Sequence, residues 1–340
     1  MMQRALNFVD ARTLTMGGQG WPSAEPFTRL PDIAKGRVPE NVWGLSRDSA
    51  GIHCDFQTHS TVLSLRWTLR SDSLAMPHMP ATGVSGIDVY IQDPRRGWTF
   101  VANVRPSGLQ NEGRVILPPL GGGKRRFRVY LPLYNGVSKL ELSGNEGMPL
   151  EPIAAHREEN AIIVYGTSIA QGGCASRPGN AWPSMVGRDL GRSVINLGFS
   201  GAGRMETEVV ELIGQLNPAV FVIDCLRNMG SFPETELTMR VARTAVLLST
   251  AHPTTPLVFV DLDTDGGRDR YADRNTWQRD AVLALPELRS RKLAFVNGEK
   301  LLGTDNEGTV DGVHPNDLGM RRQADAVSEV LKRIIRKQGQ

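Results

Sequence analysis

Side chains suited to acyl transfer follow several short apolar runs of this sequence. Ser168 comes after one such run and Asn228 after another, while Asp311 and His314 stand together before the last helical stretch. Acyl transfer needs a nucleophile, a base, a group that orients the base, and hydrogen-bond donors for the oxyanion. The sequence holds this inventory, although each residue also has a plain structural interpretation as a helix cap, a turn residue or a surface histidine.

Parallel strands are the elements that would bring these residues together. Five continuous apolar runs are typical of strands buried on both faces of a sheet, and they cover residues 162–165, 194–197, 220–223, 257–260 and 293–296. Helices are predicted between and after them, at residues 181–190, 205–216, 234–250, 274–286 and 316–336. This alternation predicts a doubly wound α/β domain with a five-stranded parallel sheet. Ligands bind at the carboxyl ends of such strands, so the polar residues should converge on one rim.

The first half of the chain has a different pattern. Short alternating runs predict an all-β sandwich or jelly roll, with strands at residues 61–67, 86–91, 98–101, 114–117, 127–131 and 137–142. Asn135-Gly136 is a hairpin turn signal, because type I′ turns need positive φ at both positions. We therefore predict an N-terminal β-sandwich domain over residues 1–152 and a catalytic domain over residues 153–340.

Four segments, each after a predicted strand, resemble the conserved blocks of SGNH (GDSL-like) hydrolases. In chain order they are Gly166-Thr167-Ser168, with Thr in place of the usual Asp, then Asn196-Leu197-Gly198-Phe199-Ser200-Gly201, Arg227-Asn228, and Asp311-Gly312-Val313-His314-Pro315. In the first half, Gly86-Ile87-Asp88-Val89-Tyr90 is similar to the Gly-x-Asp-Leu-Tyr motif of the β domain that precedes one bacterial branch of this family. The resemblance implies an SGNH, flavodoxin-like catalytic domain behind a β sandwich.

The resemblance also implies a role for each catalytic residue. Ser168 would be the nucleophile, His314 the general base and then the acid, and Asp311 the residue that holds the imidazole. The backbone amides of Ser168 and Gly201 and the side chain of Asn228 would form the oxyanion hole. No Gly-x-Ser-x-Gly elbow surrounds Ser168, which argues against the α/β-hydrolase arrangement.

Substrate contacts are expected where the chain departs from the family's pattern or forms loops. The departures are Arg227, where a small or apolar residue is usual, and the Asp-rich stretch 261–269, which includes Asp263. The stretch copies half of a calcium-binding EF-hand loop, but Ala272 stands where the bidentate Glu belongs, so we interpret it as a solvated loop. We also hypothesise that His78 and Met79, in a proline-bounded loop, reach over the catalytic rim.

The predicted activity is hydrolysis of small O-acyl esters, acetyl esters foremost, of a carbohydrate or a decorated metabolite. An acyltransferase would use the same acyl-enzyme with a non-water acceptor, and a binding protein on a hydrolase fold is the non-catalytic alternative. No His-x-x-x-His, His-Glu or Cys-x-x-Cys spacing indicates a metal site, so neither a metal nor another cofactor is expected.

Composition narrows the partners and the compartment. The 340 residues carry a net charge of +3, from 39 basic and 36 acidic residues, which gives no basis for binding nucleic acid or an anionic membrane. Three cysteines at unrelated spacings argue against a disulfide framework, and no apolar run has the length of a signal peptide or a membrane helix. We expect a cytoplasmic protein with a small-molecule substrate, and a homo-oligomer is left open.

Overall fold

The computed structural model describes residues 6–118, 123–154, 161–264, 271–288, 292–299 and 301–336. The chain forms two compact units. Unit 1 comprises Met1–Pro31, Arg47–His156 and Ser176–Gly179, and unit 2 comprises Asp32–Ser46, Arg157–Ala175 and Asn180–Gln340. The units exchange short segments of chain, and the domain boundary predicted after residue 152 stays a prediction.

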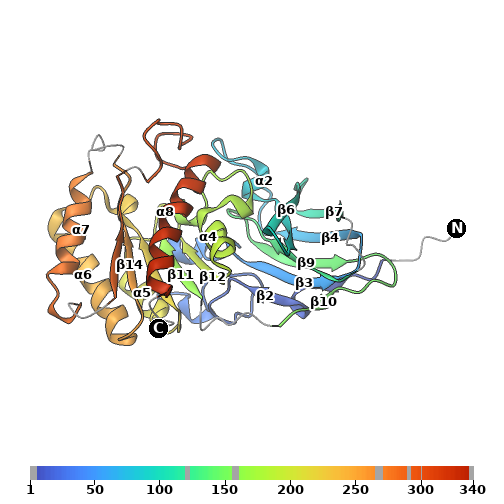
Figure 1. Ribbon diagram of the computed structural model, residues 1–340, viewed down its shortest axis with the longest axis horizontal. Coiled ribbons are helices and arrows are strands. Elements are labelled where there is room, and N and C mark those ends of the chain that lie inside the picture. Colours follow the sequence, from blue (N-terminus) through green and yellow to red (C-terminus); the bar gives the residue numbers. More distant parts are fainter. Residues whose placement is uncertain are drawn as a thin grey trace. The chain divides into compact units, whose positions relative to one another are not determined.

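Unit 1 contains two antiparallel sheets (Figure 1). One has the strand order β1 (Val9–Asp10), β9 (Val137–Ser143), β4 (Val62–Leu69) and β7 (Gln110–Ile116). The other has the order β10 (Glu151–Pro152), β3 (His53–Thr58), β8 (Arg125–Tyr130), β5 (Ile87–Asp93) and β6 (Gly97–Val104), with β2 (Thr15–Gly17) beside β3. The short helix α2 (Ala81–Val84) precedes β5. The six predicted strands correspond to β4 through β9, and β3 was not expected from the sequence.

Side chains on alternate positions of these strands build the core of unit 1. Leu63, Leu65 and Trp67 of β4 belong to the same buried cluster as Phe56 of β3 and Phe127 of β8. Successive side chains of a strand point to opposite faces, so this period of two buries one face of each sheet. Full burial of an apolar side chain of this size contributes roughly 1.5–3 kcal/mol. The two sheets therefore form a sandwich, as the alternating pattern predicted.

The prediction of a hairpin at Asn135-Gly136 is wrong. The strands on either side, β8 and β9, belong to different sheets and do not pair with each other. Asn135 is buried, and its side chain exchanges hydrogen bonds with the backbone of Ser71 and donates to the hydroxyl of Ser85. At Gly136 a Cβ would lie 2.2 Å from the carbonyl oxygen of Arg47. The pair thus serves a crossing between sheets, in which close packing rather than a type I′ turn requires these residues.

Unit 2 is built on a five-stranded parallel sheet, as predicted. Its order is β12 (Val194–Gly198), β11 (Ile162–Gly166), β13 (Val220–Asp224), β14 (Leu257–Val260) and β15 (Leu293–Val296). The helices are α1 (Glu40–Leu45), α3 (Ser168–Gln171), α4 (Trp182–Leu190), α5 (Thr207–Ile213), α6 (Glu234–Ala251), α7 (Asp273–Leu283) and α8 (Asp317–Arg336). Each of the five predicted strands and five predicted helices is confirmed to within a few residues.

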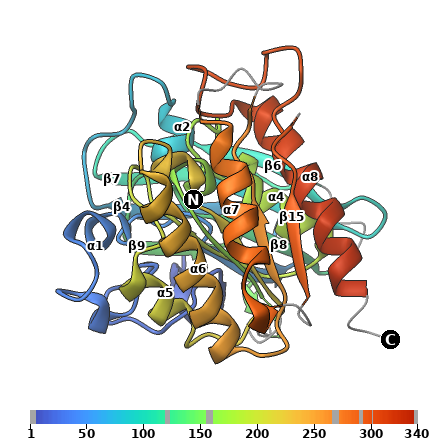
Figure 2. The ribbon, with the colours of Figure 1, turned by 90° about the vertical axis from the view of Figure 1, so that its left-hand side faces the viewer.

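The helices of unit 2 form two groups beside the sheet. Helix α4 packs with α8, and α6 packs with both α5 and α7 (Figures 1 and 2). Strand β11 is the first of the sheet, and the chain adds β12 on one side of it and β13 on the other. Strand order therefore reverses beside β11, and the carboxyl end of a strand at such a switch point is the usual ligand site of this architecture.

None of the helices within the described ranges combines the length and the apolar character needed to cross a bilayer. The three cysteines, Cys54, Cys174 and Cys225, are free thiols and are buried.

Candidate active site

Ser168 is the first residue of α3, directly after β11 reaches the switch point. Thr167 caps this short helix, because its hydroxyl accepts the backbone N–H of Ile169 at 3.3 Å. The capping function that could have explained Ser168 therefore belongs to its neighbour. Only 5% of Ser168 is exposed, so its hydroxyl is directed by protein groups rather than by bulk water.

Ser168, His314 and Asp311 form a continuous hydrogen-bonded chain in unit 2. Ser168 Oγ lies 3.0 Å from His314 Nε2, and His314 Nδ1 lies 2.8 Å from Asp311 Oδ2. When Nδ1 carries the hydrogen that points at the carboxylate, Nε2 is left to accept the hydroxyl proton of the serine. The structure thus brings Ser168 together with the local pair of Asp311 and His314, in the order expected for the predicted nucleophile, base and orienting group.

The Asp311 carboxylate is held by its own loop. Besides the imidazole, it accepts the backbone N–H groups of His314 and Val313 at 2.7 and 3.0 Å through Oδ1. Burial acts to raise the pKa of Asp311, but these hydrogen bonds from His314 and Val313 outweigh it and lower the pKa to about 2. The carboxylate is therefore ionised at neutral pH, where it would favour the protonated form of a neighbouring imidazole.

The segment from Asn196 to Gly201, which resembles the second family block, lies against α3. Asn196 Nδ2 donates to the carbonyl of Ala170 at 2.8 Å, and the backbone N–H of Ser200 donates to Gln171 Oε1 at 3.0 Å. At Gly198 a Cβ would come within 2.1 Å of the backbone nitrogen of Gln171, so only glycine permits this approach. The loop that follows β12 is consequently fixed to the helix that starts with the nucleophile candidate.

Gly201 and Asn228 are linked through Ala202, the residue that follows Gly201. Gly201 has a φ of 65°, which favours glycine, and Asn228 Nδ2 donates to the carbonyl of Ala202. One amide hydrogen of Asn228 is spent on this bond, and a primary amide carries two. Asn228 itself stands in a 3-10 turn, Leu226–Met229, that begins just past β13. Their predicted role as oxyanion donors stays a prediction that this arrangement permits.

Two of the residues predicted to contact the substrate, Arg227 and Asp263, contact each other. Arg227 Nη2 lies 3.5 Å from the backbone carbonyl of Asp263, while Asp263 Oδ1 accepts the backbone N–H of Leu302 at 3.3 Å. Asp261, at the start of the same stretch, is buried and forms an ion pair with Arg279. Residues 265–270 lie outside the described ranges, and with them most of the remaining Asp-rich stretch. A role for Arg227 and Asp263 in substrate binding stays a prediction.

His78 and Met79 belong to unit 1. Met76 and Met79 pair their backbones, with N–H to carbonyl distances of 2.9 and 3.1 Å, so the segment is a tight turn. His78 is exposed at this turn, whereas Met79 is 2% exposed. The hypothesis that this loop reaches over the catalytic residues stays a hypothesis.

The surroundings of His314 favour a base over a metal ligand. Cys174 Sγ lies within 4.8 Å of a ring nitrogen of His314. Both ring nitrogens, however, already face Ser168 and Asp311, and burial raises the pKa of the Cys174 thiol. A metal would need the thiolate and a free nitrogen lone pair, and this arrangement favours neither.

Sequence reasoning assigned no role to Asp224, the last residue of β13. It is 8% exposed, and its Oδ2 accepts a hydrogen bond from Gln323 Nε2 of α8 at 3.0 Å. Burial raises its pKa to about 7, although Gln323 and Arg227 act in the opposite direction. A carboxyl that ends a fully apolar strand in the sequence is the signal that could have marked it.

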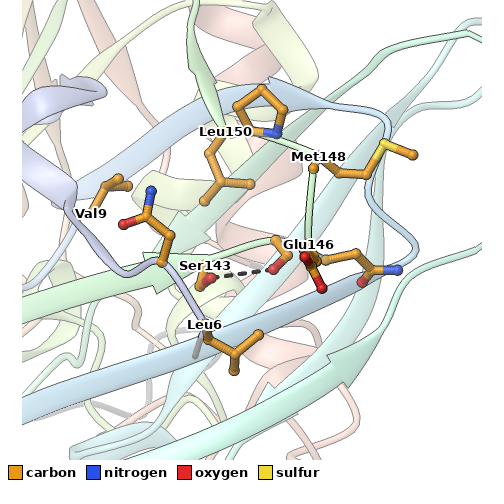
Figure 3. Close-up of a pocket in the computed structure, with 11 residues that line it drawn as sticks. Leu6, Val9, Ser143, Glu146, Met148 and Leu150 are labelled. Carbon is orange, nitrogen blue, oxygen red and sulfur yellow. Dashed lines mark hydrogen bonds between the residues drawn. The ribbon is translucent and has the colours of Figure 1, made fainter. Parts of the chain in front are cut away.

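A cavity of about 260 Å³ in unit 1 contains none of the predicted site residues. It lies between the segment that includes Leu6 and Val9 and the loop from Ser143 to Leu150 (Figure 3). Its walls are mainly apolar, and Ser143 Oγ donates to the carbonyl of Gly144 at 3.2 Å. Because Ser168, His314 and Asp311 do not line this cavity, it is not the candidate catalytic site.

Comparisons with known proteins agree with this geometry. The family model of GDSL-like lipases/acylhydrolases matches residues 159–332, and the model of the N-terminus of SGNH-hydrolase-type esterases, named for its GxDLY motif, matches residues 6–149. A protein from Bacteroides ovatus, assigned as a GDSL-like lipase, is 33% identical, with a TM-score of 0.84 over 96% of this chain and 98% of that chain. No curated protein matches the chain.

Two other solved structures share the fold at lower identity. The salicylyl-acyltransferase of a tetracycline biosynthetic pathway is 18% identical, with a TM-score of 0.78 over 97% of this chain and 98% of that chain. A family two carbohydrate esterase from Clostridium thermocellum is 12% identical, with a TM-score of 0.63 over 84% of this chain and 92% of that chain. From the two family matches and the Bacteroides relative, we conclude that the chain belongs to the GDSL-like lipase/acylhydrolase family and is a carboxylic ester hydrolase of the SGNH type.

Proposed function

We propose that the protein hydrolyses small O-acyl esters, acetyl esters foremost, through an acyl-enzyme on Ser168. The observation that carries this proposal is the chain from Ser168 Oγ to His314 Nε2 at 3.0 Å and from His314 Nδ1 to Asp311 Oδ2 at 2.8 Å. A hydroxyl in contact with a base that is itself oriented by a carboxylate is the arrangement that activates a serine.

In the first half of the reaction Ser168 Oγ attacks the ester carbonyl carbon as His314 Nε2 takes the hydroxyl proton. The carbonyl oxygen becomes an oxyanion, for which the backbone amides of Ser168 and Gly201 and the side chain of Asn228 are the proposed donors. Losing one such donor typically costs on the order of 10²–10³ in rate. The imidazolium then protonates the departing alcohol as the C–O bond of the ester breaks, which leaves the acyl group on Ser168.

In the second half a water molecule attacks the acyl carbon, and His314 accepts one of its protons. The bond between the acyl carbon and Ser168 Oγ then breaks, the proton returns to Oγ, and the free acid leaves. Asp311 remains a carboxylate throughout, because the hydrogen bonds from His314 and Val313 hold its pKa at about 2. The proposed cycle uses the protein's own side chains, its backbone amides and water.

The choice of a carbohydrate or a decorated metabolite as the alcohol rests on fold-level likeness. Carbohydrate esterases share the fold over most of this chain, and so does a salicylyl-acyltransferase. The acyltransferase is the second candidate function, because it covers 97% of this chain with the same two-part architecture. In that case an alcohol or amine would replace water in the second half of the reaction.

A panel of p-nitrophenyl esters of increasing chain length, together with acetylated sugars, tests the proposal on the wild type and on Ser168→Ala. We expect the wild type to cleave acetyl esters, and the variant to lose on the order of 10³-fold or more in kcat. Ser200→Ala is the matched control, since its backbone N–H rather than its hydroxyl makes the contact with Gln171. Adding candidate acceptors and measuring how the acyl group partitions separates transfer from hydrolysis. Undiminished cleavage by Ser168→Ala would refute the proposed nucleophile.

A further inference from the structure

Asp88 of β5 is a fully buried carboxylate that does not contribute to the apolar core of unit 1. Its Oδ2 accepts a hydrogen bond from Arg177 Nη1 and another from the backbone N–H of Gly179, both at 2.8 Å. Its Oδ1 accepts from Asn103 Nδ2, also at 2.8 Å. A buried charge is retained only when it is paired and fully hydrogen-bonded, and Asp88 meets that condition with groups from two distant parts of the chain.

Two partners of Asp88, Arg177 and Gly179, belong to one four-residue segment, Ser176–Gly179. Arg177 also donates to the hydroxyl of Tyr90 at 2.6 Å, and its guanidinium lies 3.8 Å from the centre of the Phe100 ring. The hydroxyl of Thr82 donates to the carbonyl of Ser176 at 2.6 Å. At Gly179 a Cβ would lie 2.3 Å from the Tyr90 hydroxyl, so the backbone must approach the sheet this closely.

This segment belongs to unit 1, although the residues on both sides of it belong to unit 2. The stretch before it leads back to the nucleophile candidate by short steps. Ala175 N–H donates to the carbonyl of Gly172 at 2.9 Å, and the N–H groups of Gly172 and Gly173 donate to the carbonyl of Ser168 at 3.0 and 2.9 Å. Hydrogen bonds therefore restrain the chain at several points between Ser168 and Gly179.

We propose that Asp88 is a positioning residue for the ester hydrolysis, which it serves by anchoring Ser176–Gly179 and, through the turn at 172–175, the backbone of Ser168. This inference rests on the proposed function of Ser168. It gives the β sandwich a task in catalysis besides its own stability, because the carboxylate comes from a strand of unit 1. Misplacing a catalytic group by about 1 Å costs on the order of 100-fold in rate, so even a small relaxation of this segment is measurable.

The same sheet provides a matched control. Asp55 of β3 is also fully buried and forms an ion pair with Arg128 of the neighbouring strand β8, at 2.8 and 2.7 Å. Both residues of that pair lie within the sheet, whereas Asp88 holds a segment that continues into unit 2. Asp88→Asn and Asp55→Asn each replace a buried carboxylate by its neutral isostere and leave an arginine without its counter-charge.

The experiment compares kcat and KM of both variants with the wild type, at a temperature where thermal melting shows each protein to be folded. We expect Asp88→Asn to lower kcat about 10- to 100-fold with little change in KM, and Asp55→Asn to stay within about twofold. Hydrogen exchange provides a readout independent of activity: amides of residues 172–179 should exchange faster in Asp88→Asn and at the wild-type rate in Asp55→Asn.

Equal kcat values for the two variants, or unchanged exchange at residues 172–179 in Asp88→Asn, would overturn the inference. If Asp88→Asn does not fold, Arg177→Lys is used instead. Lysine keeps the positive charge but lacks the guanidinium that donates to both Asp88 and Tyr90. Failure of the proposed function is recognised separately, since Ser168→Ala would then retain activity whatever Asp88→Asn does.

Discussion

The buried carboxyl of Asp224 predicts that the folded protein loses stability as the pH rises toward 7. Burial raises the pKa of Asp224 from an ordinary 3.8 to about 7 in the fold. The folded chain therefore keeps this proton at a pH where the unfolded chain has released it, and stability falls between about pH 4 and pH 7 and then levels off. A difference of about three in pKa corresponds to about 4 kcal/mol in all, of which about 2–3 kcal/mol falls between pH 5 and pH 8.

Asp224→Asn removes the titration and keeps an oxygen that can accept the hydrogen bond from Gln323 Nε2. Urea unfolding at pH 5 and at pH 8 gives the free energy of unfolding of both proteins, and the change between the two pH values is compared. We expect the wild type to lose about 2–3 kcal/mol more than the variant over this interval. Titrations of other groups are common to both proteins and cancel in the comparison. Equal losses in the two proteins would show that Asp224 is ionised in the fold at pH 5 and would refute the reasoning.

Two further predictions concern the site directly. Asp311→Asn should lower kcat by roughly 10²-fold with little change in KM. This loss is smaller than for a fully buried orienting aspartate, because the Asp311 side chain is 39% exposed. Steady-state kinetics on a p-nitrophenyl ester measures the effect. A kcat within twofold of the wild type would remove Asp311 from the catalytic set. Gly203→Ala should destabilise the fold by about 2 kcal/mol or more, because φ is 67° and the new Cβ would lie 2.0 Å from the carbonyl oxygen of Gly166. Gly191→Ala, with a φ of 62° and open space around the Cβ, is the control for backbone strain alone, and equal thermal shifts would contradict the steric argument.

The parallel sheet was predictable because its sequence signal depends on burial alone. All five strands are continuous apolar runs, and a strand covered on both faces needs no alternation to be recognised. Strand β3 illustrates the opposite case, since it is buried on both faces although it carries the polar residues His53 and Asp55. Asp55 is buried through its ion pair with Arg128, 73 positions along the chain. A sequence pattern cannot show that a charged side chain will find a distant partner, so this strand was missed.

In the candidate site, too, contacts between residues close in sequence could be predicted, and contacts between distant residues could not be predicted from the local pattern. The contact between Asp311 and His314 is local, because the carboxylate also binds the backbone N–H of His314 within one loop, and a spacing of three residues is enough to predict it. The contact between Ser168 and His314 joins residues 146 positions apart, and the resemblance to a family predicted it where composition could not. The grip of Asp88 on Arg177 and Gly179 had no sequence signal of its own beyond the motif that contains Asp88.

The two segments that we predicted to depart from the family's pattern are connected by a hydrogen bond. Arg227 directly precedes Asn228, and its guanidinium lies against the carbonyl of Asp263, in the Asp-rich stretch. The side chain of Asp263 is in turn held by the backbone of Leu302. A small or apolar residue at position 227 could not donate this hydrogen bond to the backbone of Asp263. Since Arg227 directly precedes Asn228, a proposed oxyanion donor, we expect Arg227→Ala to change the relative kcat/KM values for esters of different alcohols, measured on the same ester panel.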